Sequence, residues 1–173
     1  ALLIGALYGV LTTRPRDIIQ TLTAAVTEGI KNVAPVIGLM MGVGMAVTAL
    51  THPLVKDTLT PFLQGIIPSG RLGYVLFFGL LAPLALYRGP LNLYGLGAGV
   101  GAVLTGLLPS HLVMGALMST GLVQGVCDPT NTHNVWTAGF TNTDVNDILR
   151  KTLPWVWAAA ILSLATIGIL YWA

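Results

Sequence analysis

The chain has 173 residues, of which 54% are hydrophobic and 8% are charged, and its net charge is +2. Soluble domains carry roughly 25% charged residues, so this composition excludes an ordinary water-soluble domain. The small net charge excludes nucleic acid as a partner, and the single Cys127 excludes an internal disulfide framework. We therefore expect an all-α polytopic membrane protein, a multi-pass protein in contact with the lipid bilayer.

The chain begins with an apolar run, Ala1–Thr12, that lacks an initiator methionine and a basic leader. As a helix it extends about 18 Å, shorter than the ~30 Å hydrocarbon core. We therefore expect residues 1–173 to be a single transmembrane domain that is a fragment or half of a longer transporter. The basic turn Arg14-Pro15-Arg16-Asp17 follows, and its arginines favour the cytoplasmic side.

Three segments that do not read as ordinary membrane spans come next. Residues Asp17–Val33 show helical spacing with polar positions, which predicts a helix lying at the membrane interface. Residues Ala34–Leu50 are apolar but short for a span, and His52-Pro53 ends them. The sequence predicts one arm of a re-entrant hairpin there, with Val55–Ile67 as either its return arm or a second interfacial helix.

A long hydrophobic region from Leu72 to Leu108 is interrupted by Arg88-Gly89-Pro90-Leu91-Asn92. Pro90 removes a backbone donor and disfavours helix at the preceding residue. Broken backbone at membrane depth persists where protein or a wet cavity supplies hydrogen-bond partners. The Arg88 charge and the positive end of a helix starting near Leu91 favour an anion such as a carboxylate. The alternative is an ordinary loop whose Arg88 reaches the interface.

A second polar segment follows the span Leu112–Val126. It is Asp128–Asn134, with the sequence DPTNTHN. The amides and hydroxyls of this segment can coordinate Na⁺ or bind a carboxylate, and a carboxyl or an imidazole can take a proton. The alternative is a turn outside the membrane in which Asn and Thr act as caps.

The last segment, Leu153–Ala173, is the clearest span. Trp155 and Trp172 lie about 26 Å apart along a helix, as two interfacial aromatic belts require. Arg150 and Lys151 precede it and favour the cytoplasmic side. Together the segments predict about five to six membrane segments, including a re-entrant hairpin and broken helices. The alternating glycines Gly95, Gly97, Gly99 and Gly101 predict close helix packing or flexibility.

Three stretches resemble the C-terminal half of an ion transporter superfamily carrier, the group of gluconate, citrate and dicarboxylate permeases. They are the glycine-rich Gly38–Ala49, Arg88-Gly89 with the small residues through Gly101, and Asp128–Trp136 followed by Asp147–Leu153. Pro90-Leu91 departs from the small hydroxyl residue that this family often has after the glycine. The resemblance implies an elevator-type secondary transporter with paired hairpins. It also implies an inverted N-terminal half, and a homodimer or a second half-transporter chain as partner.

The sequence thus predicts a proton- or sodium-coupled transporter of a small organic anion in the inner (plasma) membrane. We expect no enzyme activity, no metal site and no cofactor apart from Na⁺ or H⁺ as coupling ion. The expected anion-binding residues are Arg88, Gly89, Asn92, Thr130, Asn131, Thr132 and Asn134, and the expected coupling residues are Asp128 and His133.

Two other interpretations remain open. One is a non-transporting integral membrane subunit of a larger complex, in which both polar segments contact a partner protein. The other is an intramembrane enzyme that uses Asp128 and His133, which ranks last because no second carboxylate or metal-ligand set lies nearby in the sequence.

Overall fold

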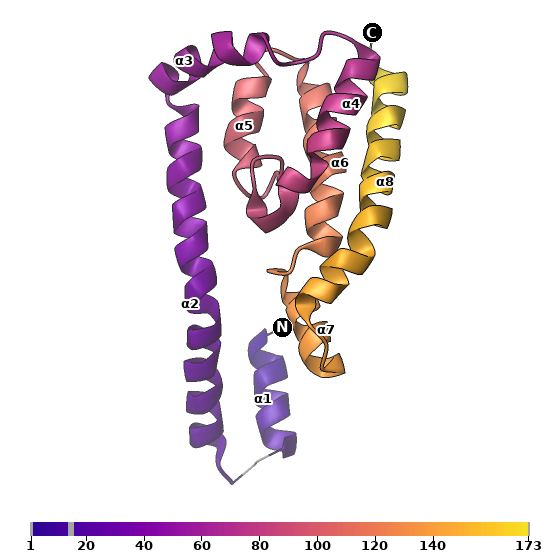
Figure 1. Cartoon of the computed structure of the whole chain (residues 1–173). Helices are drawn as coiled ribbons and strands as arrows, with labels where there is room; N and C mark the ends of the chain where they lie inside the picture. The colour runs from indigo at the N-terminus through magenta and orange to yellow at the C-terminus, as the bar shows by residue number, and fades with distance from the viewer. Residues whose placement is uncertain (1, 14–15, 173) are drawn as a thin grey trace. The chain divides into compact units, whose positions relative to one another are not determined.

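The computed structural model describes residues 2–13 and 16–172, excluding the side chains of residues 2, 3, 13, 32, 35 and 36. Within these ranges the chain is helical and contains no strand (Figure 1). It divides into two compact units, Ala1–Gly42 and Val43–Ala173, which are described separately below. Of the basic turn expected at Arg14-Pro15-Arg16-Asp17, residues 14 and 15 lie outside the described residues, and Arg16 and Asp17 form a turn and a bend before the first residue of the next helix, Ile18.

The first unit contains α1 (Leu2–Thr13) and the beginning of α2 (Ile18–Thr51). The sequence predicted a boundary between an interfacial helix ending at Val33 and a membrane arm beginning at Ala34. That prediction is wrong, because α2 is one helix of 34 residues. Helix growth is cooperative, so a position that could not start a helix can still lie within one that is already formed.

The end of α2 agrees with the expected stop at His52-Pro53. Pro53 is the first residue of α3 (Pro53–Gln64), a position where proline loses no helical hydrogen bond. The axis bends by 74° between the end of α2 and α3. A bend of this size between two apolar helices fits either a broken span or a re-entrant loop, so the expected re-entrant hairpin stays a prediction. Helix α3 runs crosswise to the end of α2 (Figure 1), and the alternative of a second interfacial helix also stays a prediction.

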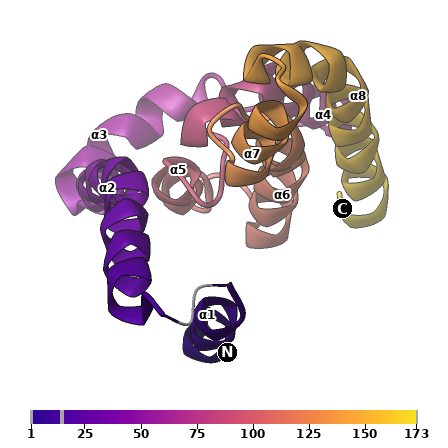
Figure 2. The same cartoon turned by 90° about the horizontal axis from the view of Figure 1, so that it is seen from below.

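The remaining elements of the second unit form a helical bundle. They are α4 (Arg71–Leu81), the 3₁₀ helix η1 (Ala82–Arg88), α5 (Gly97–Leu104), α6 (Ser110–Cys127), α7 (Thr132–Thr141) and α8 (Val145–Tyr171). The most extensive contact is between α6 and α8, followed by α4 with α8 and α6 with η1. Figure 2, which views the bundle from below, shows α4, α6 and α8 grouped together.

Buried side chains and a few polar contacts hold this bundle. The Tyr74 hydroxyl donates to the Leu112 carbonyl at 2.9 Å, and the Trp157 indole donates to the Gly79 carbonyl at 2.6 Å. Apolar packing surrounds these bonds through Phe78 and Leu164, both fully buried. Lipid is as apolar as a leucine side chain, so close packing and interhelical hydrogen bonds must supply the specificity of association.

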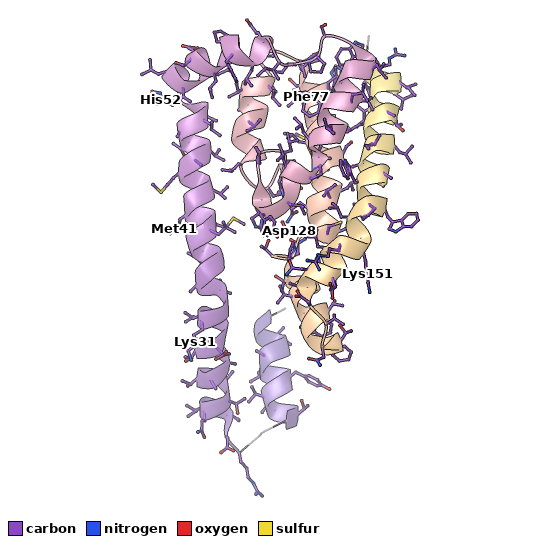
Figure 3. The ribbon with its side chains drawn as sticks, in the orientation of Figure 1. Lys31, Met41, His52, Phe77, Asp128 and Lys151 are labelled. Atoms are coloured by element: carbon purple, nitrogen blue, oxygen red, sulfur yellow. The ribbon has the colours of Figure 1, made fainter. Side chains whose placement is uncertain are left out.

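The starts of α4 and α6 lie beside the end of α8. The Arg71 guanidinium donates to the Trp172 carbonyl at 3.2 Å, and a His111 ring nitrogen lies 3.3 Å from the Tyr171 carbonyl. Both α4 and α6 therefore run antiparallel to α8. The far end of the bundle carries the polar stretch Asn142–Lys151, where Lys151 projects away from α8 (Figure 3).

Among the described residues, the helices that can cross a membrane are fewer than predicted. Three stretches are long and apolar enough, namely Arg71–Arg88, Ser110–Thr141 and Val145–Tyr171, and a fourth is added if the bent pair of α2 and α3 counts as one span. The sequence predicted five to six segments because it counted short apolar runs. With 8 residues, α5 cannot cross the hydrocarbon core alone. The inverted repeat stays a prediction.

Candidate functional site

The hydrophobic region between Leu72 and Leu108 breaks where the sequence predicted it would. Tyr87 and Arg88 adopt left-handed backbone conformations with φ of 54° and 57°, and Gly89 is extended. The helix does not restart near Leu91 as expected, because α5 begins only at Gly97. Residues 87–97 therefore form an irregular segment, here called the broken-helix loop. It includes the last two residues of η1 and the first residue of α5.

The broken-helix loop is closed by its own backbone. The Leu96 amide donates to the Arg88 carbonyl at 3.0 Å, and the Gly97 amide donates to the Asn92 carbonyl at 2.9 Å. A Cβ atom on Gly89 would collide with the Leu84 carbonyl oxygen, and glycines at 95 and 97 avoid equivalent collisions with loop backbone. These glycines permit close approach of backbone to backbone.

The alternating glycines therefore serve two purposes, of which the sequence predicted one. A Cβ on Gly101 would lie 2.8 Å from Leu117 on α6, so this position confirms the expected close helix packing. Gly95 and Gly97 instead close the broken-helix loop. This second role could have been inferred from the sequence, because Gly95 and Gly97 lie only a few residues after the break at Arg88-Gly89-Pro90.

Asp128 joins the two polar segments predicted from the sequence. Its side chain is fully buried at the end of α6 (Figure 3). One carboxylate oxygen accepts from the Tyr87 amide at 2.6 Å, and the other accepts from the Thr130 amide at 2.8 Å and the Thr130 hydroxyl at 2.6 Å. The carboxylate thus satisfies the backbone N–H at the left-handed turn, which has left the helix and needs a partner.

Two of the expected anion-binding residues instead cap α6. The Asn131 side-chain amide donates to the Gln124 carbonyl at 2.6 Å. The Asn134 side-chain amide donates to the Val126 carbonyl at 2.9 Å and to the Asp128 carbonyl at 3.0 Å. These amides add donors at the end of the helix, where the Gln124 carbonyl also accepts from the Asp128 backbone amide at 3.3 Å and the Asp128 carbonyl from the Asn131 backbone amide at 3.1 Å. Both side-chain N–H groups are therefore directed to the protein's own backbone.

Two polar residues of α6 support this arrangement, and the sequence reasoning missed them. The Thr120 hydroxyl donates to the Leu91 carbonyl at 2.8 Å, and the Gln124 side chain donates to the Asn131 side-chain oxygen at 2.8 Å. Both residues are buried. Their four-residue spacing inside an otherwise apolar span was the signal that could have identified them, because residues four apart share a helix face.

Three other expected site residues have side chains without partners in the described part of the chain. Thr132 and His133 are exposed at the start of α7, and Arg88 is half-buried in the broken-helix loop. No hydrogen bond or ion pair of these three side chains occurs among residues 2–13 and 16–172. Arg88 is thus a permanent cation beside the Asp128 segment without being paired to it.

Asn92 is the most unusual of the predicted residues. Its side chain is 1% exposed, and its oxygen accepts from the Tyr94 amide at 2.7 Å. Its side-chain nitrogen is the one buried side-chain polar atom without a hydrogen-bond partner in the part of the chain that the structure describes. Leaving a buried donor unpaired costs about 1–3 kcal/mol, so the arrangement calls for an acceptor.

That nitrogen belongs to a side chain lining a cavity of about 330 Å³ between the broken-helix loop and α6. The loop contributes Asn92, Leu93 and Tyr94, and α6 contributes residues from Leu117 to Val126. We call this cavity the Asn92 pocket. Its walls are largely apolar.

The position of the Asn92 pocket along the α8 span follows from contacts of the neighbouring helices. The Ser119 and Ser163 hydroxyls are 2.8 Å apart, and Ser163 lies halfway along α8 between Trp155 and Trp172. Thr120, which bonds to Leu91 of the loop, is the next residue on α6. Since tryptophans mark the two interfaces of a span, the loop beside Asn92 lies near the middle of the α8 span.

A comparison with protein-family models finds no match to this chain, and comparisons with curated proteins and with solved structures find none either. Within the described ranges, no three His, Cys, Asp or Glu side chains come together in a way that could hold a metal ion. The broken-helix loop, the unpaired Asn92 amide nitrogen and the adjoining cavity are the features that distinguish this site.

Proposed function

We propose that this chain is part of a secondary transporter that binds a small organic anion at the broken-helix loop. The observation that carries the proposal is the Asn92 side-chain nitrogen, buried without a partner beside a cavity near mid-span. An unpaired donor is satisfied by an acceptor oxygen, and carboxylates are strong acceptors. Discontinuous helices near mid-membrane are the usual location of transporter substrate sites.

Arg88 supplies the charge in this proposal. It precedes Asn92 by four residues on the same loop, and its guanidinium has no counter-charge within the described ranges. Charged side chains inside membrane segments are costly and commonly serve a function. An arriving carboxylate would provide both the missing acceptor for Asn92 and the missing anion for Arg88.

The proposal assigns Asp128 to coupling through the loop. Its carboxylate accepts from the Tyr87 amide, which precedes Arg88. A proton or Na⁺ that occupied this carboxylate would compete with the Tyr87 bond and so alter the loop that carries Arg88 and Asn92. His133 is the second candidate, exposed at the start of α7. Alternating access by elevator motion, with a homodimer or a second half-transporter chain, completes the proposed mechanism.

Counterflow in proteoliposomes tests this proposal. Vesicles containing the full chain are loaded with an unlabelled carboxylate from a panel of gluconate, citrate, succinate and hexanoate, and uptake of the labelled compound is followed. We expect at least one compound to exchange, and Arg88→Ala to reduce the exchange at least tenfold. Lys151→Ala is the matched control, because Lys151 is an exposed cation outside the loop. Absence of exchange for the whole panel would contradict the proposal.

A non-transporting subunit of a larger complex is the second candidate function. It is favoured by the internal hydrogen bonds of Asp128, Asn131 and Asn134, which serve the fold and leave fewer groups for a solute. It predicts that no panel compound exchanges and that Thr132 and His133 contact a partner protein. Crosslinking from a photoreactive residue at position 133 would identify that contact.

A further inference from the structure

The composition of the Asn92 pocket restricts what it can bind. Its walls are formed mainly by aliphatic side chains and glycine, including Leu93, Leu117, Met118, Leu122 and Val126. Beside Asn92, Tyr94 and Gln124 also line it, and the Gln124 side-chain nitrogen already donates to Asn131. Burying apolar ligand surface against apolar walls makes the binding free energy more favourable. Burying a ligand hydroxyl there without a hydrogen-bond partner makes it less favourable. One unpaired amide nitrogen with two N–H groups is present, so an acceptor group placed there is favoured.

The orientation of the Asn92 amide is set by the loop. Its oxygen accepts from the Tyr94 amide at 2.7 Å. Rotating the amide by half a turn would place its N–H₂ against the Tyr94 N–H, two donors facing one another. The nitrogen is therefore the atom left without a partner, and the ligand must present an acceptor.

The size of the pocket limits the ligand further. A volume of about 330 Å³ corresponds to roughly eleven liquid waters and lies at the small end of ligand sites. A lipid acyl chain could fill apolar space, but it has no acceptor for the Asn92 nitrogen. A small molecule with an apolar body and a single acceptor at one end fits both requirements.

We propose that the Asn92 pocket binds a small monocarboxylate with an apolar body, such as a medium-chain fatty acid, in preference to a polyhydroxylated or tricarboxylic acid. This inference rests on the proposed function and narrows its substrate class. The carboxylate end lies at Asn92, and the hydrocarbon body lies against α6. Met118, Leu122 and Val126 are partly exposed, so the pocket opens along this side of α6.

Hexanoate and gluconate provide a matched pair of probes. Both have six carbons and one carboxylate, and they differ in the hydroxyls of gluconate. Equilibrium binding of labelled hexanoate to the purified full chain in detergent, without phospholipid, is measured with either compound as unlabelled competitor. We expect hexanoate to compete at least tenfold more strongly than gluconate. Hexanamide, which lacks the charge, is expected to compete at least tenfold more weakly than hexanoate.

Gly121 allows the pocket to be filled without disturbing its polar group. It lines the pocket on α6, and a Cβ added there meets no atom within 4 Å. Gly121→Leu is expected to reduce hexanoate binding at least tenfold. Gly139→Leu is the matched control, because Gly139 also has open space around a Cβ but lies on α7 outside the pocket. Asn92→Leu, which removes the donor, is expected to reduce binding to a similar extent, with the melting temperature as a check of folding.

The outcomes separate the inference from the proposed function. If gluconate or hexanamide competes as well as hexanoate, or if Gly121→Leu binds hexanoate like Gly139→Leu, the pocket assignment is wrong. In that case exchange of another carboxylate in proteoliposomes would still support an anion transporter. If hexanoate does not bind and no carboxylate exchanges, both proposals fail.

Discussion

At the residue scale, the carboxylate of Asp128 replaces a hydrogen bond that the helix cannot make. The Tyr87 amide leaves the helical ladder in a left-handed conformation, and Asp128 accepts from it. A left-handed non-glycine residue costs about 1–2 kcal/mol, so a strong acceptor at this point helps to stabilise the break. The same side chain also orders the turn that begins α7 through Thr130.

Asp128→Asn is expected to destabilise the protein by about 1–3 kcal/mol. The asparagine oxygen can retain the bonds from Thr130, but the side-chain nitrogen then faces the Tyr87 amide, which leaves two buried donors opposed. The free energy of unfolding in detergent measures the effect. Asp144→Asn is the control, because Asp144 is an exposed cap of α8. Unchanged stability of Asp128→Asn would contradict this structural role.

Gly89→Ala is expected to destabilise the protein by about 1–3 kcal/mol, because an added Cβ meets the Leu84 carbonyl oxygen in backbone that cannot move aside easily. Gly70→Ala is the matched control. Gly70 is also extended, at the start of α4, and a Cβ there meets no atom within 4 Å. Thermal melting of both variants checks the difference. Equal melting temperatures would show that the loop relaxes around position 89.

At the element scale, the end of α6 is built by side chains that follow it. Asn131 and Asn134 turn back to donate to its last carbonyls, and Gln124 on α6 holds Asn131 in place. An exposed helix end could use water for this purpose. A helix that ends against the broken-helix loop cannot, because the neighbouring groups at Asp128 and Asn134 are buried.

Asn134→Ala is expected to lower the free energy of unfolding by about 1–2 kcal/mol, since the Val126 carbonyl loses its side-chain donor and the Asp128 carbonyl keeps only the bond from the Asn131 backbone amide. Thr132→Ala, two residues earlier on α7, should change it by less than about 0.5 kcal/mol, because Thr132 is exposed. Chemical denaturation in detergent measures both. If Thr132→Ala lowered the free energy of unfolding more than Asn134→Ala, Asn134 would not be the residue that caps α6.

At the scale of the whole molecule, both ends of the second unit carry basic side chains. The end formed by the starts of α4 and α6 carries Arg71 and His111 beside the last residues of α8. The opposite end carries Arg150 and Lys151 at the beginning of α8. Cytoplasmic flanks are enriched in Lys and Arg, so the Arg150–Lys151 end is expected on the cytoplasmic side.

Labelling with a membrane-impermeant maleimide tests this orientation. Ser69→Cys and Asn146→Cys place exposed thiols at the two ends, while the native Cys127 is buried and provides a low background. In intact cells we expect Ser69→Cys to be labelled from outside, and Asn146→Cys only after the membrane is permeabilised. The unmodified chain is the control. The reverse pattern would overturn the orientation.

Several local features could be predicted from the sequence because they depend on neighbouring residues. Pro90 after Gly89 predicted the break, His52-Pro53 predicted the end of a helix, and the tryptophans at positions 155 and 172 predicted the last span. Each is a short-range effect of backbone sterics or interfacial preference. The boundary expected at Val33 was wrong because helix cooperativity extends over more residues than the pattern covers.

The sequence by itself determined that this is an all-helical membrane protein with a break at Arg88-Gly89 and a polar turn at Asp128–Asn134, since both follow from composition and local chemistry. Only the tertiary structure decided which polar groups are already paired. Asp128 lies 41 residues from its Tyr87 partner, and the spacing of residues along the chain does not reveal such a contact. The fold therefore assigns Asp128, Asn131 and Asn134 to internal bonds and leaves the Asn92 donor unpaired. A hydrogen bond depends on distance and direction in space, and the packing of α6 against the broken-helix loop sets both.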